Sequence, residues 1–258
     1  MSSIHPTAII SPQAEIGPDV EVGPYCVIGD GVVLGEGCRL HNHVTIHGPT
    51  RIGPRNTFYT AAAIGQQTQD LKYKGEPTFL EVGEDNVFRE FCTVNRGTLP
   101  GSKTVIGSHN HFLAYCHIAH DCIVGDHVIF SNNGTLAGHV IVEDHVILGG
   151  LTAVHQFCRI GTHAITGGCS KIVQDVCPYM IADGNPAATR GPNMVGLQRA
   201  GFTEADIRAL KEAYKALFFR KPNTATALEA LEKTEHAANA CVGKLMAFIR
   251  ASERGVTK

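Results

Sequence analysis

Two histidines and an aspartate crowd into the segment HIAHDC, residues 117–122, of this 258-residue chain. A neutral imidazole can take up a proton near neutral pH, and a carboxylate beside it can orient the ring. His120, followed directly by Asp121, therefore has the residue types of a general base and its partner. The same two residue types can also ligate a metal ion, so their positions must decide between the two chemistries.

An apolar residue recurs at every sixth position around this segment. The series covers residues 4–64, returns over 82–94 and continues over 106–172, where only Thr166 departs from it. Glycine often follows the apolar residue, where a corner requires unusual backbone angles. Such a short, fixed period of strand-forming residues predicts a parallel β-helix, in which each unit is buried only by stacking on its neighbours.

The repeat resembles that of the hexapeptide-repeat acyltransferases. This resemblance implies a left-handed β-helix of triangular section with three hexads in each coil. The left hand comes from the resemblance alone, because parallel crossovers are generally right-handed. The family also implies a homotrimer with active sites between subunits.

Most of the nine cysteines follow the repeat. Six of them stand two residues before an apolar position, where the pleat points inward again: Cys26, Cys38, Cys92, Cys116, Cys122 and Cys158. The count is odd and no CxxC pair exists, so neither a disulfide framework nor a zinc framework is indicated. We expect these six cysteines to be reduced residues that fill the core.

Two interruptions and one boundary divide the chain. Polar residues with Gly and Pro predict external loops near 65–79 and 96–103, and the first loop holds Asp70 and Lys72. A solvated loop tip is the simpler interpretation of this charged stretch. The period fails beyond Ile172, which predicts a β-helix over 1–189 and a helical domain over 190–258. Thr203 followed by Asp206 is typical of a helix start.

The net charge of −2 and the pI near 6.7 argue against a surface that coats nucleic acid. No signal peptide and no long apolar run is evident, so we expect a cytoplasmic protein without a membrane span. From residue 190 onward the chain has 12 Lys and Arg against 7 Asp and Glu, and the remainder has 10 against 17. The basic helical domain fits an acidic partner, although a solvated helical face explains the charge equally well.

Residues 18 apart should stack about 4.8 Å apart on successive coils. Asp121 then lies next to His139, and His120 lies next to Gly138, whose amide could stabilise an oxyanion. Neighbouring residues of a strand point to opposite faces, so a pair between His120 and Asp121 requires a corner. The predicted cleft also holds His117, His155 and Gln156.

Several segments are more specific than the repeat, namely QDLKYKGEPT (69–78), NRGT (95–98), HIAHDC (117–122), LAGHV (136–140), AVHQFCRIG (153–161) and GGCS (167–170). Over nearly the whole length, the chain resembles the bacterial UDP-N-acetylglucosamine O-acyltransferases of lipid A synthesis. The resemblance implies transfer of an (R)-3-hydroxyacyl chain from acyl carrier protein to the glucosamine 3-hydroxyl of UDP-N-acetylglucosamine. No cofactor and no metal are implied.

The same resemblance implies a role for individual residues. His120 would be the base, Asp121 its partner and the Gly138 amide the oxyanion donor. The positions that match substrate contacts are Asp70, Lys72, His117, His139, His155 and Gln156, with Asn193 and Arg199 at the nucleotide end. Those that match the acyl-chain ruler are Leu113, Ile165 and Gly168, and Gly168 leaves room for a longer chain.

Three departures from the family pattern and three alternatives remain. Asn95 stands where relatives commonly have His, Val195 where a Glu contacts the nucleotide, and Ala200 where a second Arg follows the first. The acceptor could therefore be a 3-amino sugar nucleotide. The alternatives are a zinc enzyme resembling the γ-class carbonic anhydrases, a non-catalytic β-helical binding module, and an acetyl-CoA-dependent acetyltransferase of the same fold.

Overall fold

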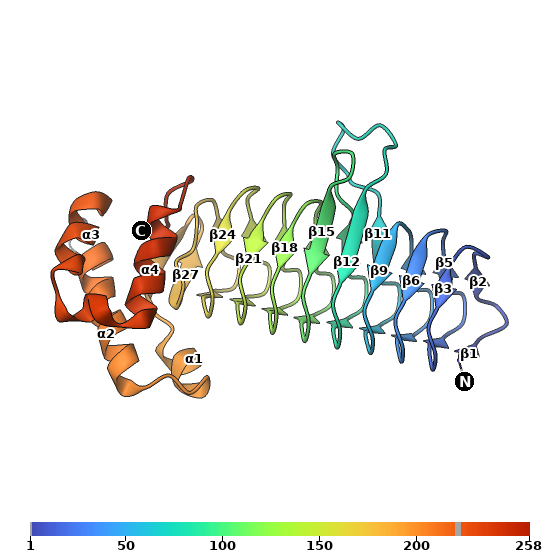
Figure 1. The fold of residues 1–258 in the computed structure, drawn as a ribbon, viewed down its shortest axis with the longest axis horizontal. Coiled ribbons are helices and arrows are strands. Elements are labelled where there is room, and N and C mark those ends of the chain that lie inside the picture. Colours follow the sequence, from blue (N-terminus) through green and yellow to red (C-terminus); the bar gives the residue numbers. More distant parts are fainter. Residues whose placement is uncertain (1, 220–222) are drawn as a thin grey trace.

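The computed structural model describes residues 2–219 and 223–258. The chain winds into a long three-sided prism that ends in a group of helices (Figure 1). Sheet A forms one face of the prism and contains β1 (Ser3–Ile4), β4 (Glu21–Val22), β7 (Arg39–Leu40), β10 (Thr57–Phe58), β13 (Val87–Phe88), β16 (His111–Phe112), β19 (Ile129–Phe130), β22 (Ile147–Leu148), β25 (Ile165–Thr166), β27 (Met180–Gly184) and β28 (Ala187–Pro192).

Sheets B and C form the other two faces. Sheet B contains β2 (Ile9–Ile10), β5 (Val27–Ile28), β8 (Thr45–Ile46), β11 (Ala63–Gln66), β14 (Thr93–Asn95), β17 (His117–Ile118), β20 (Thr135–Leu136), β23 (Ala153–Val154) and β26 (Lys171–Ile172). Sheet C contains β3 (Glu15–Ile16), β6 (Val32–Leu34), β9 (Thr50–Ile52), β12 (Phe79–Val82), β15 (Lys103–Ile106), β18 (Ile123–Val124), β21 (Ile141–Val142) and β24 (Arg159–Ile160). The strands pair in parallel within each sheet except at the antiparallel hairpin of β27 and β28.

The predicted register is confirmed by the strand pairing. His117 pairs with Thr135 and Thr135 with Ala153, so residues 18 apart occupy the same place on successive coils. From Val22 onward the apolar residue of each hexad is buried and stacks on its equivalents, as in the column of Phe58, Phe88 and Phe112, whereas Ile4 is 48% exposed. Thr166 is also buried, and its hydroxyl accepts a hydrogen bond from the Gly149 amide at 2.9 Å.

Each coil turns three corners, and the corner residue usually has a left-handed backbone. Its φ lies between 54° and 68° for non-glycine residues, which occupy this region rarely. Corner residues therefore also form columns along the prism. The corner between sheets B and C carries Asp121, His139 and Phe157, and the corner between sheets C and A carries His109, His127, His145 and His163.

The six cysteines that fit the repeat are buried and free, as predicted. Burial raises the pKa of Cys122 to about 12 and that of Cys158 to about 11. Thiols in this state are poor nucleophiles at neutral pH. Cys169 lies outside the core pattern and is exposed, whereas Cys177 is buried.

Two excursions leave the prism at the corner between sheets B and C. The first connects β11 to β12 over residues 67–78, and the second connects β14 to β15 over residues 96–102. They project together from neighbouring coils (Figure 1). Because Asp121 lies at the same corner one coil further on, both excursions stand beside the predicted catalytic segment.

The helical end comprises α1 (Met194–Arg199), α2 (Glu204–Tyr214), the π-helical turn η1 (Lys215–Phe219), α3 (Thr224–Glu232), the short 3₁₀ helix η2 (Glu235–Ala238) and α4 (Ala240–Arg250). The predicted start of α2 is confirmed, because Thr203 and Asp206 form a reciprocal capping box. Leu210, Leu231 and Leu245 belong to a second buried core. Among the described residues, no helix is long and apolar enough to span a membrane.

Candidate active site

His120 and Asp121 form a hydrogen-bonded pair. The His120 Nδ1 lies 2.8 Å from the Asp121 Oδ2, and the two side chains are 13% and 9% exposed. Asp121 adopts a left-handed φ of 59°, so the chain turns between the two residues and their side chains meet. The pairing therefore depends on the corner.

The Asp121 carboxylate contacts several other groups besides His120. Its Oδ2 also accepts a hydrogen bond from the Thr98 amide at 3.2 Å, and the His139 Nε2 lies 3.8 Å away. The Asp121 amide donates to the Thr104 hydroxyl at 2.9 Å. Burial alone would raise the pKa of Asp121, but the neighbouring Ser102 hydroxyl, the hydrogen bond to His120 and the nearby His139 outweigh it and lower the pKa below its usual value.

Gly138 packs directly on the His120 ring, one coil away. A Cβ atom at Gly138 would lie 2.4 Å from Cε1 and 2.6 Å from Nε2 of His120, so only glycine fits without moving the imidazole. The Gly138 carbonyl accepts a hydrogen bond from the Phe157 amide. The Gly138 amide donates to no group within the described residues, which leaves it available to an external acceptor.

Two further histidines of the predicted cleft surround this pair. His117 hydrogen-bonds through Nδ1 to the Thr93 hydroxyl at 2.7 Å. Burial, and secondly the neighbouring His120, lower the pKa of His117, which favours its neutral form at pH 7. His139 meets the His120 ring edge-on with centroids 5.2 Å apart, and its other side stacks on Phe157.

Other predicted site residues lie near this cluster without touching it. His155 and Gln156 are exposed at the end of β23, and the His155 Nδ1 lies 3.1 Å from the Gln156 carbonyl. Asp70 and Lys72 belong to the 67–78 excursion, where the Asp70 carboxylate accepts the Lys72 amide at 2.9 Å. The Lys72 side chain is exposed.

The remaining predicted residues lie at other edges of the prism. Asn193 caps α1 and donates to the carbonyl of His163 at the corner between sheets C and A, and Arg199 is exposed at the end of the same helix. Leu113 follows β16 of sheet A, Ile165 belongs to β25 and Gly168 follows β25 toward sheet B. Within one chain, these five residues are not brought to the His120–Asp121 pair.

Sequence reasoning missed the hydroxyl groups that hold the cluster in place. Thr93 binds His117, and Thr104 binds the Asp121 amide. Thr98 contacts Asp121 through its backbone amide, and a backbone contact cannot be predicted from the residue type. Only the positions of these residues in the sequence could have indicated their roles: Thr98 ends the NRGT segment, and Thr104 stands in the inward position before Ile106.

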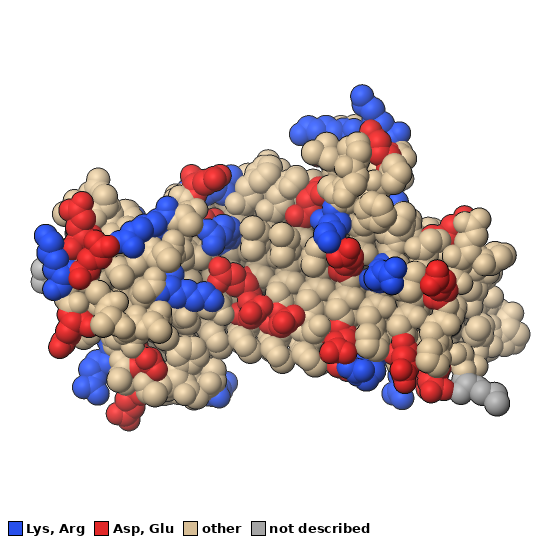
Figure 2. Space-filling view, in the orientation of Figure 1, with Lys and Arg blue, Asp and Glu red and all other residues tan. Residues whose placement is uncertain are grey.

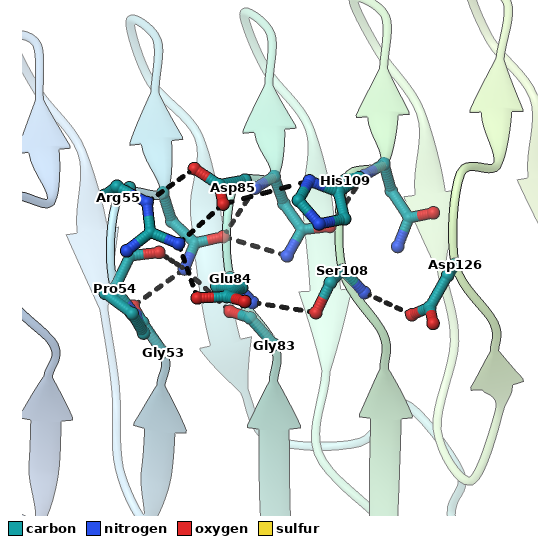
Figure 3. Close-up of polar contacts among 12 residues, drawn as sticks. Gly53, Pro54, Arg55, Gly83, Glu84, Asp85, Ser108, His109 and Asp126 are labelled. Carbon is teal, nitrogen blue, oxygen red and sulfur yellow. Dashed lines mark hydrogen bonds and ion pairs between the residues drawn. The ribbon is translucent and has the colours of Figure 1, made fainter.

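Among the described residues, two groups of side chains have the composition of a metal site. The ligand atoms of His120, Asp121 and His139 lie within 4.8 Å of one another, as do those of Glu84, Asp85 and His109. Figure 3 shows the second group, in which the Arg55 guanidinium hydrogen-bonds to both carboxylates. The positive charge of Arg55 therefore competes with any cation there. The first group contains two imidazoles and one carboxylate, a set that zinc also accepts.

The sequence matches protein-family models and known relatives. Residues 175–257 match the model of the second domain of UDP-N-acetylglucosamine O-acyltransferase, and residues 1–35 and 103–138 match the bacterial transferase hexapeptide repeats. The acyl-[acyl-carrier-protein]–UDP-N-acetylglucosamine O-acyltransferase of Akkermansia muciniphila is 52% identical over 99% of both chains. The enzyme of the same name from Rippkaea orientalis is 56% identical over 98% of this chain and 91% of its own.

Solved structures extend the agreement to the whole fold. LpxA from Acinetobacter baumannii superimposes with a TM-score of 0.95 at 45% identity, covering 99% of each chain. The UDP-N-acetylglucosamine acyltransferase of Arabidopsis gives a TM-score of 0.90 at 40% identity and covers 99% of this chain and 100% of its own. These matches confirm the left-handed parallel β-helix with C-terminal helices. The chain belongs to the UDP-N-acetylglucosamine O-acyltransferase family.

Proposed function

We propose that this protein transfers an (R)-3-hydroxyacyl chain from acyl carrier protein to the 3-hydroxyl of UDP-N-acetylglucosamine, in lipid A synthesis. The observation that carries the proposal is the His120–Asp121 pair with Gly138 packed on the imidazole. This arrangement combines a general base, a group that orients it and a free amide within one coil spacing. Membership of the family supplies the donor and the acceptor.

The proposed mechanism begins with the neutral form of His120. Its Nδ1–H donates to the ionised Asp121, which fixes the tautomer and leaves the Nε2 lone pair free to take the proton of the sugar hydroxyl. The sugar oxygen attacks the thioester carbonyl carbon, and the Gly138 amide stabilises the oxyanion. Collapse of the tetrahedral intermediate breaks the C–S bond, and the departing thiolate receives the proton from His120. No acyl-enzyme forms.

The other predicted residues would bind the two substrates. We assign Asp70, Lys72, His117, His139, His155 and Gln156 to substrate contacts, Asn193 and Arg199 to the nucleotide, and Leu113, Ile165 and Gly168 to the end of the acyl chain. These groups lie on different edges of one prism, which favours a homotrimer in which a second copy completes each site. The trimer, the cytoplasmic location and the boundary near residue 190 remain predictions.

Charge supports acyl carrier protein as the donor. The helical segment from residue 190 has 12 basic against 7 acidic residues, whereas the rest of the chain is acidic in balance. In Figure 2 Lys and Arg gather at the tip of the upper excursion and are interspersed with acidic residues over the helical end. Basic side chains at both places can steer an acidic carrier toward the corner that holds His120.

The direct test is mass spectrometry of the products formed from UDP-N-acetylglucosamine and a series of 3-hydroxyacyl carrier proteins of increasing length. We expect one product whose mass increases by a single hydroxyacyl group, formed fastest at one chain length. The 3-amino sugar nucleotide serves as a second acceptor. If no hydroxyacyl product forms with either acceptor, the proposal is wrong, and a product formed only from acetyl-CoA would identify an acetyltransferase.

The cluster of His120, Asp121 and His139 supports one competing function, a zinc enzyme. That function requires a metal ion that is lost together with activity on chelation. We expect metal analysis of the purified protein to find less than one zinc per chain and full acyl transfer after chelation. Stoichiometric zinc whose removal abolishes turnover would favour the zinc enzyme.

A further inference from the structure

The two excursions are joined to each other beside the catalytic corner. The Arg96 amide donates to the Gln66 carbonyl at 2.9 Å, and the Gly101 amide donates to the Pro77 carbonyl at 2.9 Å. These backbone contacts hold residues 67–78 and 96–102 together. The side chains of Thr68 and Thr98 also connect the two excursions.

Thr68 and Thr98 are hydrogen-bonded to each other and buried. Their hydroxyl oxygens lie 2.8 Å apart, and each residue is only 4% exposed. A buried hydroxyl pair contributes more than an exposed one, because water competes less for its two members. The contact therefore fixes the position of Thr98 relative to the larger excursion.

Each of the two threonines is also hydrogen-bonded to an aspartate of the predicted site. The Thr98 amide donates a hydrogen bond to the Asp121 Oδ2 at 3.2 Å. Thr98 therefore helps to position the carboxylate that is hydrogen-bonded to His120. On the other side, the Thr68 hydroxyl accepts the Asp70 amide at 3.1 Å. The Asp70 carboxylate in turn accepts the Lys72 amide. A continuous series of hydrogen bonds thus connects Lys72 to His120.

From this geometry we propose that Thr98 and Thr68 are positioning residues that couple the 67–78 excursion to the orientation of the His120–Asp121 pair. The proposal rests on the proposed role of His120 as the base. Thr98 touches no reacting atom, and it acts by holding its own amide against the Asp121 carboxylate. Movement of the excursion on substrate binding is then transmitted to the base through the two hydroxyl groups.

The chain provides a matched control for this idea. Thr78 lies at the end of the same excursion, is fully buried, and its hydroxyl has no hydrogen-bond partner within the described residues. Thr78→Val and Thr98→Val therefore make the same chemical change at the same depth. Only Thr98→Val removes a contact of the proposed series.

The test compares kcat and KM of purified Thr98→Val, Thr68→Val, the double variant, Thr98→Ser and Thr78→Val. We expect Thr98→Val to lower kcat roughly fivefold to tenfold, the loss typical of one buried hydrogen bond, with less than a twofold change in KM for the nucleotide. Thr98→Ser should restore kcat, and Thr78→Val should match the wild type. The double variant should be no slower than Thr68→Val, since both single changes remove the contact between Thr68 and Thr98, and Thr68→Val also removes the acceptor of the Asp70 amide.

Three results would overturn the coupling: Thr98→Val within twofold of the wild type, an equal loss in Thr78→Val, or additive losses in the double variant. If Thr98→Val melts well below the wild type, Thr68→Val tests the same contact from the other side. His120→Ala, measured in parallel, separates the two proposals. An active His120→Ala contradicts the base itself, whereas an inactive one beside a normal Thr98→Val contradicts only the coupling.

Discussion

Two stacked columns that contain histidines run along different corners of the same prism. At the corner between sheets C and A, the rings of His109, His127, His145 and His163 stack face to face with centroids 4.5 to 4.9 Å apart. At the corner between sheets B and C, the His139 ring lies nearly perpendicular to the ring of His120 and stacks on Phe157. The repeat generates both columns, because it places every eighteenth residue at the same corner. At this second corner the column consists of Asp121, His139 and Phe157, and His120 comes one position before Asp121.

The columns differ in what each ring touches. His120 is 13% exposed, pairs with a carboxylate and packs on a glycine, so its two nitrogens have different surroundings. In the other column, His109 is 45% exposed, and its acidic neighbour Asp85 is already bound by Arg55. His127 and His145 mainly contact other imidazoles. From this comparison we expect that the neighbours of a histidine, rather than the presence of histidine, make a catalytic base.

The sharpest way to test this comparison is to remove one histidine from each column. His120→Ala should lower kcat roughly a thousandfold or more, because general-base catalysis is lost while the fold is kept. His127→Asn, which suits the left-handed corner, should stay within twofold. Steady-state kinetics would measure both, with circular dichroism as the check on folding. Similar losses in the two variants would mean that the columns do not differ in function.

The second prediction concerns the carboxylate. Asp121→Asn should lower kcat roughly a hundredfold, since an amide can donate to Nδ1 and stabilise the wrong tautomer of His120. Asp85→Asn, the equivalent change beside His109, should leave kcat unchanged. Parallel kinetic assays would check both variants, and a loss of less than threefold in Asp121→Asn would show that Asp121 does not orient the base.

The third prediction concerns the packing of the imidazole. Gly138→Ala places a Cβ 2.4 Å from the His120 ring and should lower kcat roughly tenfold to a hundredfold by displacing it. Gly150→Ala is the control, because its Cβ would meet its nearest neighbour at an ordinary 3.4 Å. Kinetics together with thermal melting would separate misplacement of the base from unfolding. Full activity in Gly138→Ala would contradict the close packing.

The smallest expected effect lies in the stacked column and concerns stability. Burial, followed by the charges of His145 and Lys244, lowers the pKa of His163 to about 4. The unfolded chain then binds the extra proton between about pH 6.5 and 4, so this contribution to stability is present above pH 6.5 and is lost as the pH falls toward 4. After allowance for partial exposure, it amounts to about 1–2 kcal/mol.

His163→Asn should therefore weaken the dependence of stability on pH without changing the dependence of kcat on pH. Urea unfolding at pH 5 and pH 8, at one protein concentration, would measure the difference. An unchanged slope of stability against pH in His163→Asn would show that His163 is not the group responsible.

The repeat made most of the fold predictable. The six-residue period predicts which residues form strands, which side chains point inward and which residues stack on successive coils. The stacking of Gly138 on His120 was therefore predicted from their separation of 18 residues. Burial of the six cysteines followed in the same way. The left hand of the helix required the family resemblance, because no pattern of apolar residues distinguishes the two hands.

The contacts made outside the repeat could not be predicted. The meeting of His120 and Asp121 depends on the backbone angle at one corner, and an aspartate occupies that region only when its surroundings favour it. The excursions obey no period, so the contact of Thr68 with Thr98 and the bond from the Thr98 amide to Asp121 arise from three-dimensional packing. Residue types alone carry no sign of a backbone donor.

The role of His120 as the base is tested most directly by the pH dependence of kcat/KM, with hydroxyacyl carrier protein and UDP-N-acetylglucosamine as substrates. In the wild type we expect kcat/KM to fall with decreasing pH on the acid side as one group takes up a proton, because the protonated imidazole cannot act as a base. The residual activity of His120→Ala should show no such fall over the same range. The same acid limb in His120→Ala would contradict the assignment and place the base elsewhere.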